Sequence, residues 1–184
     1  MDVDYRLAFE MAPVGLALSR NRTMVDCNRH LCEMFGAAPE QLIGQSFQVL
    51  YPSADEFERT GARIAPILNR RGTYSDDRIM KRLEGRFKGD TFWCHVTGRA
   101  LNQEAPHEAG IWTFEDLSAS RPVKAELTGR EREVAALLLD GLTSKEIGRT
   151  LDISHRTVEI YRAGLMRKYQ ASNTGDLVHK LMSG

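Results

Sequence analysis

Long apolar runs and a cysteine-rich pattern are both missing from this sequence of 184 residues. No apolar segment approaches the roughly 18 to 20 residues that a membrane-spanning helix needs, so we expect no membrane partner. The acidic start, "MDVDYRLAFEMAP", lacks the basic and then apolar order of a signal peptide. The 3 cysteines are an odd number without scaffold-like spacing, which favours free thiols in a reducing cytoplasm.

Histidine and catalytic motifs are also sparse. The 5 histidines are scattered, and neither a nucleophile elbow nor a phosphate-cradling glycine loop occurs. This pattern predicts a protein that is not an enzyme. The segment "CNRHLC" groups Cys27, His30 and Cys32, but these side chains would face different ways and lack a fourth ligand, so we predict no metal.

A net charge is absent as well, because 25 Lys and Arg residues balance 25 Asp and Glu residues. The balance hides an asymmetry: residues 1–122 hold 15 basic against 17 acidic side chains, and residues 123–184 hold 10 against 8. Between Arg156 and Tyr169, several basic side chains oppose only Glu159. A modest local excess of cations is a weak indication of nucleic-acid binding and needs support from a fold.

A domain boundary is expected where "DLSASRPVKAELTG" interrupts the regular patterns with Ser, Pro and short polar residues. The residues before it mix strand-like and helix-like segments, whereas those after it are typical of helices only. We therefore predict an α+β chain with a first domain over residues 1–120, a linker over 121–127 and an all-α domain over 128–184.

Four helices are expected after the boundary. Thr128, with Glu131 three positions later, predicts a capping box, and Gly141 ends that first helix. The residues expected to cap the other three helices are Thr143 or Ser144, Ser154, and Asn173 or Thr174. Two short helices joined by a tight turn, the second of them basic, are the sequence form of a helix-turn-helix.

The segment "LTGREREVAALLLDGLTSKEIGRTLDISHRTVEIYRAGLMRKYQASNTGDLV" resembles the four-helix DNA-binding domain of LuxR-type regulators, nearest to FixJ-like output domains. The resemblance rests on "LTxRE", "G-x-x-x-KEI", "L-x-IS-x-RTVE" and "M-x-K", although Tyr161 stands where many relatives have His. It implies binding to double-stranded promoter DNA as a homodimer, with RNA polymerase as a further partner. Leu177 and Leu181 of the last helix are the expected dimer contacts.

The resemblance also suggests which side chains meet DNA. Lys145 and polar side chains of the third helix would contact phosphates. Glu159, Ile160 and Ala163 would face base edges, where Glu accepts from a cytosine amine and the apolar pair meets thymine methyl groups. The full predicted set is Lys145, Ser154, Arg156, Thr157, Glu159, Ile160, Tyr161, Arg162, Ala163 and Lys168. The alternative, a basic helix face that is only solvated, does not account for the coincidence of motif, order and charge.

The first domain begins with two short strand-like runs around "RNR", which predict a hairpin, and Asn28 then caps a helix that Gly36 ends. Two more helical segments and three strand-like runs follow. We expect an antiparallel five-stranded sheet with helices on one face. This order, with "V-x-x-N", "L-I-G-x-S", "KGDTFWCHV" and "F-E-D-L-S", resembles a PAS domain over Phe9 to Ser120. PAS domains sense by holding a ligand between sheet and helices or by relaying partner contacts.

The resemblance implies a pocket whose ligand the sequence does not name. Haem is disfavoured because the helix expected between Ala54 and Gly72 has no His. Covalent-flavin photochemistry is disfavoured because no "NCRFLQ"-like segment occurs near Gln41 to Tyr51. The pocket residues predicted from strand alternation and the long helix are Phe92, Cys94, Val96, Trp112, Phe114, Ile64 and Leu68. The alternative, that these side chains are ordinary core, stays open.

Two other functions compete with a ligand-controlled regulator. A response regulator needs a phosphoryl-accepting first domain, but Asp2 and Asp4 come too early and no suitable Lys precedes residue 120. A small enzyme with a DNA-binding tail needs a catalytic constellation that the sequence lacks. The sequence leaves open the signal (a small ligand, a redox state or a protein partner), the operator and the direction of control.

Overall fold

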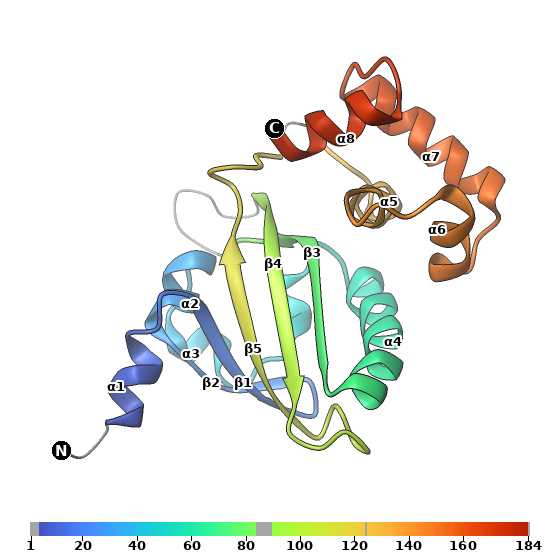
Figure 1. Ribbon diagram of the computed structural model, residues 1–184. Helices are drawn as coiled ribbons and strands as arrows, with labels where there is room; N and C mark the ends of the chain where they lie inside the picture. The colour runs from blue at the N-terminus through green and yellow to red at the C-terminus, as the bar shows by residue number, and fades with distance from the viewer. Residues whose placement is uncertain (1–3, 84–89, 124, 184) are drawn as a thin grey trace.

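The chain folds into a sheet with helices and a bundle of four helices that lies against it (Figure 1). The computed structural model describes residues 4–83, 90–123 and 125–183. The elements of the first part are α1 (Tyr5–Glu10), β1 (Gly15–Arg20), β2 (Thr23–Cys27), α2 (Arg29–Phe35), α3 (Pro39–Leu42), the 3₁₀ helix η1 (Phe47–Leu50), α4 (Ala54–Arg71), β3 (Thr73–Lys81), β4 (Thr91–Ala100) and β5 (Ala109–Asp116). Those of the second part are α5 (Gly129–Leu139), α6 (Ser144–Leu151), α7 (His155–Lys168) and α8 (Thr174–Ser183).

Five antiparallel strands form one sheet in the order β2-β1-β5-β4-β3. Asn21 and Arg22, between β1 and β2, have φ values of 49° and 62°, the left-handed backbone that a tight hairpin turn uses. Helices α2 and α4 pack on the sheet (Figure 1). The α+β class and the sheet are therefore confirmed, whereas α1 and η1 were not predicted. The sequence also predicts a turn at "FKGD" between the third and fourth strands, and residues 87–89 of it lie outside the described residues.

Asn28 ties the hairpin to the segment before it. Its side chain is fully buried and makes four hydrogen bonds. The amide oxygen accepts from the backbone N–H groups of Leu16 and Leu31. It therefore caps α2 and fixes the start of β1 beside that helix. The amide nitrogen donates to the carbonyls of Phe9 and Val14. All hydrogen-bonding capacity of this buried amide is thus used, as burial of a polar group requires.

The alternation along β4 divides the interior into two cores. Phe92, Cys94 and Val96 face the helices of the first part, and Phe92 packs edge-on against Phe35 with ring centroids 5.4 Å apart. Trp93 faces the other way and is fully buried in the core of the four-helix bundle. The sheet therefore contributes side chains to both parts of the chain.

The helices of the second part begin where the sequence predicts. Thr128 and Glu131 form the capping box of α5, and Gly141 takes the left-handed conformation just after that helix. Thr143 rather than Ser144 caps α6, and the amide of Asp176 donates to the Asn173 side chain at the start of α8. Across the part of the chain that the structure describes, no helix is both long and apolar enough to cross a bilayer.

Candidate DNA interface and ligand pocket

Helices α6 and α7 are joined by a tight turn. Asp152 ends α6 in the left-handed conformation, with φ of 53°. The hydroxyl of Ser154 accepts a hydrogen bond of 3.0 Å from the backbone N–H of Thr157 and so caps α7. Ile147 and Val158, one from each helix, are fully buried. These contacts fix the angle between the two helices, as a helix-turn-helix requires.

Gly148 allows this close packing, and we expect Gly148→Ala to lower the stability of the protein. A Cβ atom there would lie 2.7 Å from the carbonyl oxygen of Ile153, which is backbone and cannot move without opening the turn. The expected loss is about 1–3 kcal/mol in urea unfolding. Gly164→Ala in α7 is the matched control, because its Cβ would meet nothing closer than 3.4 Å and Ala favours helix. Equal losses in the two variants would contradict this account.

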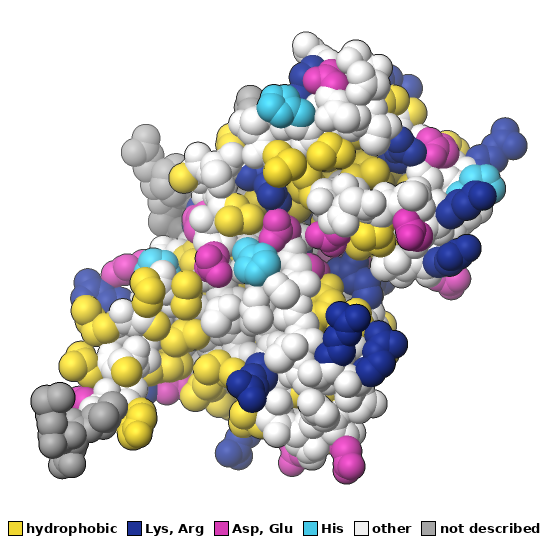
Figure 2. Space-filling view, in the orientation of Figure 1, with side chains coloured by type: hydrophobic (Ala, Val, Ile, Leu, Met, Phe, Trp, Pro, Cys, Tyr) yellow, Lys and Arg dark blue, Asp and Glu magenta, His cyan; other side chains and the backbone are white. Residues whose placement is uncertain are grey.

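One face of α7 is open to solvent. Ile160 is 66% exposed although it is large and apolar. The predicted DNA-contact residues that are also exposed on or near this face are Ser154, Arg156, Glu159, Ala163 and, at the start of α6, Lys145. Figure 2 shows Lys and Arg side chains along the edge of the bundle that α6 and α7 form. A protruding helix with cations, short side chains and an exposed Ile has the chemistry of a major-groove reader.

Sequence reasoning missed three further exposed side chains around this face, which are Arg149, His155 and Arg167. Arg149 lies one turn after Lys145 in α6, and Arg167 lies one turn after Ala163 in α7. Helical periodicity alone would have added both to the predicted face.

Arg162 and Lys168 have partners inside the protein. The guanidinium of Arg162 donates to Ser144 and Glu159 over 2.6 and 2.8 Å, and also to Thr174, so it holds α6, α7 and α8 together. The ammonium of Lys168 donates over 2.7 Å to Glu131 of the α5 capping box. Both cations therefore stabilise the bundle in the free chain, and their contacts with phosphate stay a prediction.

The Lys168–Glu131 pair makes stability depend on pH. Burial alone would raise the pKa of Glu131, but hydrogen bonds from Lys168 and Thr128 outweigh it and lower that pKa. A lowered pKa in the folded state stabilises the protein above the ordinary Glu range, and this stabilisation is lost as the pH falls through the lowered pKa.

We expect Lys168→Met to reduce stability at pH 7 by up to about 1 kcal/mol, because Lys168 is partly solvated. The difference from wild type should shrink as the pH falls below the ordinary Glu range, in urea unfolding followed at several pH values. Lys145→Met, an exposed Lys of the same domain, is the control and should show no such trend. A Lys168→Met deficit that is constant with pH would contradict the pairing.

The burial of Leu177 and Leu181 corrects their predicted role as dimer contacts. They are 0% and 1% exposed because they pack inside the bundle with α5, so they have no surface to offer a second copy. Helical spacing identified the apolar face of α8 but could not say which partner covers it. The exposed apolar side chain of α8 is Met182, at 51%.

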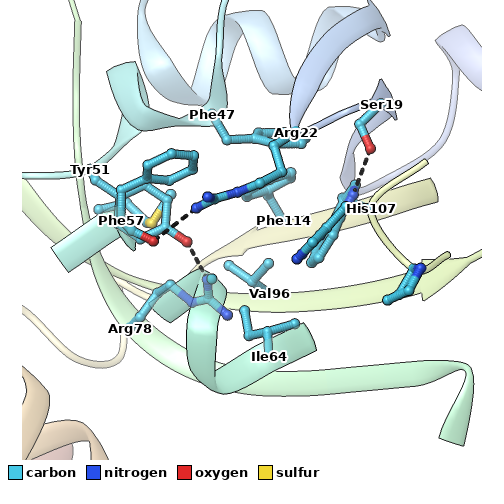
Figure 3. Close-up of a pocket in the computed structure, with 14 residues that line it drawn as sticks. Ser19, Arg22, Phe47, Tyr51, Phe57, Ile64, Arg78, Val96, His107 and Phe114 are labelled. Atoms are coloured by element: carbon cyan, nitrogen blue, oxygen red, sulfur yellow. Dashed lines mark hydrogen bonds between the residues drawn. The ribbon is translucent and has the colours of Figure 1, made fainter. Parts of the chain in front are cut away.

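A pocket lies between the sheet and helix α4 (Figure 3). Trp112 donates over 3.0 Å to the hydroxyl of Ser19 on one side, and Arg78 donates to the Tyr51 hydroxyl on the other. Four of the predicted residues line it, namely Ile64, Val96, Trp112 and Phe114. The residues that sequence reasoning missed are Ser19, Arg22, Phe47, Tyr51, Phe57, Gly61, Arg78, Met80, Pro106 and His107.

The other three predicted pocket residues do not line the cavity. Phe92 and Cys94 are core side chains packed against the helices of the first part. Leu68 packs with Ile64 and Ala100 in a small separate cluster. Strand alternation separates the two faces of each strand, and the resemblance to a PAS domain chose the inward one. Position along each strand then decides whether a side chain meets the cavity or the core beside it.

The three cysteines are buried thiols in the structure. The Sγ atoms of Cys27 and Cys32 lie 3.7 Å apart. Burial raises the pKa of Cys27, and likewise of Cys94, to about 12, so both remain protonated at neutral pH. His30, the third member of the proposed "CNRHLC" set, is exposed on α2.

A seam of ion pairs joins the two parts. Arg132 of α5 donates to Glu56 of α4 over 2.9 Å, and Arg59 of α4 donates to Glu133 of α5 over 3.0 Å. Glu56 and Glu133 are both nearly buried. Trp93 and Ile79 of the sheet fill the apolar centre of the seam. The bundle is therefore docked on the sheet and α4 through paired charges around an apolar contact.

The fold and the site define the class: a PAS-type domain joined to a helix-turn-helix domain. More than half of the chain, residues 13–119, matches the PAS domain family, and the chain belongs to it. Residues 125–181 match the family of bacterial regulatory proteins described as the luxR family. The predicted family is thus confirmed for both parts.

Three known proteins illustrate the similarity. The PAS domain of a LuxR-family transcriptional regulator from Burkholderia thailandensis is 59% identical over 63% of this chain and 99% of that one, with a TM-score of 0.60. VqmA of Vibrio cholerae shares the fold over 99% of this chain and 88% of its own, at 21% identity and a TM-score of 0.55. FixJ of Bradyrhizobium diazoefficiens is 37% identical over 54% of this chain and 47% of its own length. The chain spans a quarter to a half of the first curated relatives it matches, 24% and 47%.

Proposed function

We propose that this chain is a transcriptional regulator of the cytoplasm, which binds promoter DNA through α6 and α7 and whose PAS domain adjusts that binding in response to a small ligand. The observation that carries the proposal is the open face of α7, where Ile160 is 66% exposed beside Arg156. A thymine methyl group in the major groove would cover this apolar side chain while Arg156 reaches a phosphate beside it.

The ligand part of the proposal is supported by the pocket between the sheet and α4. The PAS domain of the Burkholderia thailandensis relative is in complex with ethanol. In this chain, Arg78 lines the pocket and also lines a small cavity at the seam, beside Arg132 and Glu133. A ligand that repositions Arg78 would therefore change the surface on which α5 docks, and with it the population of DNA-competent chains.

A homodimer is the expected binding form. One four-helix domain reads only a few base pairs, and two copies on adjacent half-sites supply the missing affinity. Met182 takes the place of Leu177 and Leu181 as the apolar side chain of α8 that a second copy could cover. RNA polymerase stays a predicted further partner.

The proposal is tested by selecting duplexes from a random library with the full chain and measuring the stoichiometry on the selected sequence. We expect one enriched motif with repeated half-sites and two chains per duplex. Recovery of sequences no richer in any motif than the starting library would overturn it.

A further inference from the structure

The charged side chains that line the pocket are basic, and a histidine lies beside them. Two arginines, Arg22 and Arg78, and one histidine, His107, meet among aromatic and aliphatic groups. No Asp or Glu is among the described residues that line it. A pocket of this composition favours a ligand that carries negative charge on one end and apolar surface on the rest.

Arg78 is fixed and has donors to spare. Its side chain is 9% exposed, and Asp76 accepts from both Nε and one terminal nitrogen, while Tyr51 accepts from the other. A guanidinium has five N–H donors, and these bonds use three. Asp76 is also shared with Arg63, over 3.0 Å, and with the hydroxyl of Tyr74 over 2.8 Å. One buried carboxylate therefore serves two arginines.

Arg22 enters the pocket from the turn between β1 and β2, and its guanidinium points toward Phe57 (Figure 3). Its guanidinium stacks 3.7 Å from the centroid of the Phe57 ring and donates over 3.0 Å to the carbonyl of the same residue. Its carboxylate partner, Glu58, is largely exposed and lies outside the pocket. A Cβ at Gly61 would collide with the guanidinium, so this glycine makes room for Arg22 against α4.

The positive charge of the pocket also affects the protonation of His107. Burial, and the charge of Arg22, lower the pKa of His107, so the imidazole is neutral at pH 7. An anion in the pocket would offset the charge of Arg22 and favour protonation of the imidazole.

The free space sets the size of the ligand. The cavity measures about 40 Å³. At about 10–15 Å³ for each water-sized group, it holds roughly three such groups before any side chain moves. A small molecule of a few heavy atoms therefore fits with a slight shift of the lining side chains.

We propose that this pocket binds a short-chain monocarboxylate, with the carboxylate between Arg78, Tyr51 and Arg22 and the alkyl end against Val96, Trp112 and Phe114. This inference rests on the proposed sensing function and names its ligand class. Charge-assisted hydrogen bonds from a guanidinium to a carboxylate supply affinity that a neutral molecule of equal size cannot match.

The test is isothermal titration calorimetry of the full chain with propionate at constant ionic strength, compared with propionamide and 1-propanol, which have nearly the same size without the charge. We expect propionate to bind at least tenfold more tightly than either neutral compound, with proton uptake at a pH just above the pKa of His107. Equal affinity for the three compounds, or no heat with millimolar propionate, would overturn the proposal.

Variants assign the binding to this pocket. Arg22→Gln and Tyr51→Phe should each weaken propionate at least threefold, and Arg78→Met should abolish the preference for propionate over propionamide. Arg99→Gln, an exposed arginine on β4, is the matched control and should bind as wild type does. If Arg78→Met fails to fold, Arg22→Gln and Tyr51→Phe still test the proposal. Unchanged propionate affinity in both of these variants would overturn it.

The same protein preparation separates this inference from the proposed function. A chain that selects a DNA motif but does not prefer propionate refutes only the ligand class. A chain that prefers propionate but enriches no motif refutes only the regulator.

Discussion

Ile160→Asp is expected to abolish specific DNA binding while leaving the fold intact. Ile160 stands at the centre of the open α7 face, between Arg156 and Ala163, and is 66% exposed. A carboxylate there would face phosphates and lose contact with thymine methyl groups, so we expect affinity to fall about a hundredfold, since like charges brought together cost several kcal/mol. The melting temperature should not change, because the side chain makes little contact within the chain.

Fluorescence anisotropy with a duplex selected by the wild-type chain measures this effect. Ile43→Asp is the matched control, because Ile43 is also an exposed isoleucine, 40% exposed, but lies in the first part of the chain. The control should bind DNA as wild type does. If both variants lose affinity equally, or if neither does, α7 is not the surface that reads DNA.

The second large effect is expected at the seam, where Arg132→Glu should release the bundle from the PAS domain. Glu56 and Arg132 are 6% and 15% exposed in their side chains. Reversing one charge places two carboxylates together in a poorly solvated site, and breaking a buried pair costs about 3–5 kcal/mol. We expect protease cleavage between residues 117 and 127 to accelerate at least tenfold.

The double variant Glu56→Arg with Arg132→Glu restores opposite charges and should return cleavage toward the wild-type rate. Rescue by the swap distinguishes a broken seam from a misfolded domain, because misfolding would not be repaired by a second buried charge reversal. Cleavage that stays fast in the double variant, or that is slow in the single one, would contradict the seam as the contact that docks the bundle.

The local signals in the sequence predicted the local structure. Thr128, Ser154 and Asn28 cap helices because a short polar side chain before an apolar helical pattern can accept the free N–H groups of the first turn. This chemistry depends only on neighbours in the chain. The helix-turn-helix, built almost entirely from such signals, was therefore predictable in detail.

The pocket and the seam were less predictable because they depend on contacts between distant segments. Sequence patterns assign charged side chains such as Arg22, in a turn, and Arg78, in a strand, to solvent. In the structure both line the pocket, because Arg22 stacks on Phe57 and Arg78 pairs with Asp76. Strand alternation puts Trp93 on the face of β4 opposite Phe92 and Cys94, but nothing in the sequence showed that the bundle covers that face. The periodicity of an apolar face does not identify what covers it.

The most direct test of the account is the salt dependence of duplex binding by the full chain. Affinity should fall as the salt concentration rises. The logarithm of the association constant should fall steeply and linearly with the logarithm of the salt concentration, because each phosphate contact releases counterions. Arg156→Gln should weaken binding to all sequences and lower the slope by about one. Arg99→Gln, an exposed arginine near the end of β4, should change neither the affinity nor the slope. Unchanged slopes in both variants, or no binding to any duplex at low salt, would contradict the claim that this chain acts on DNA through α6 and α7.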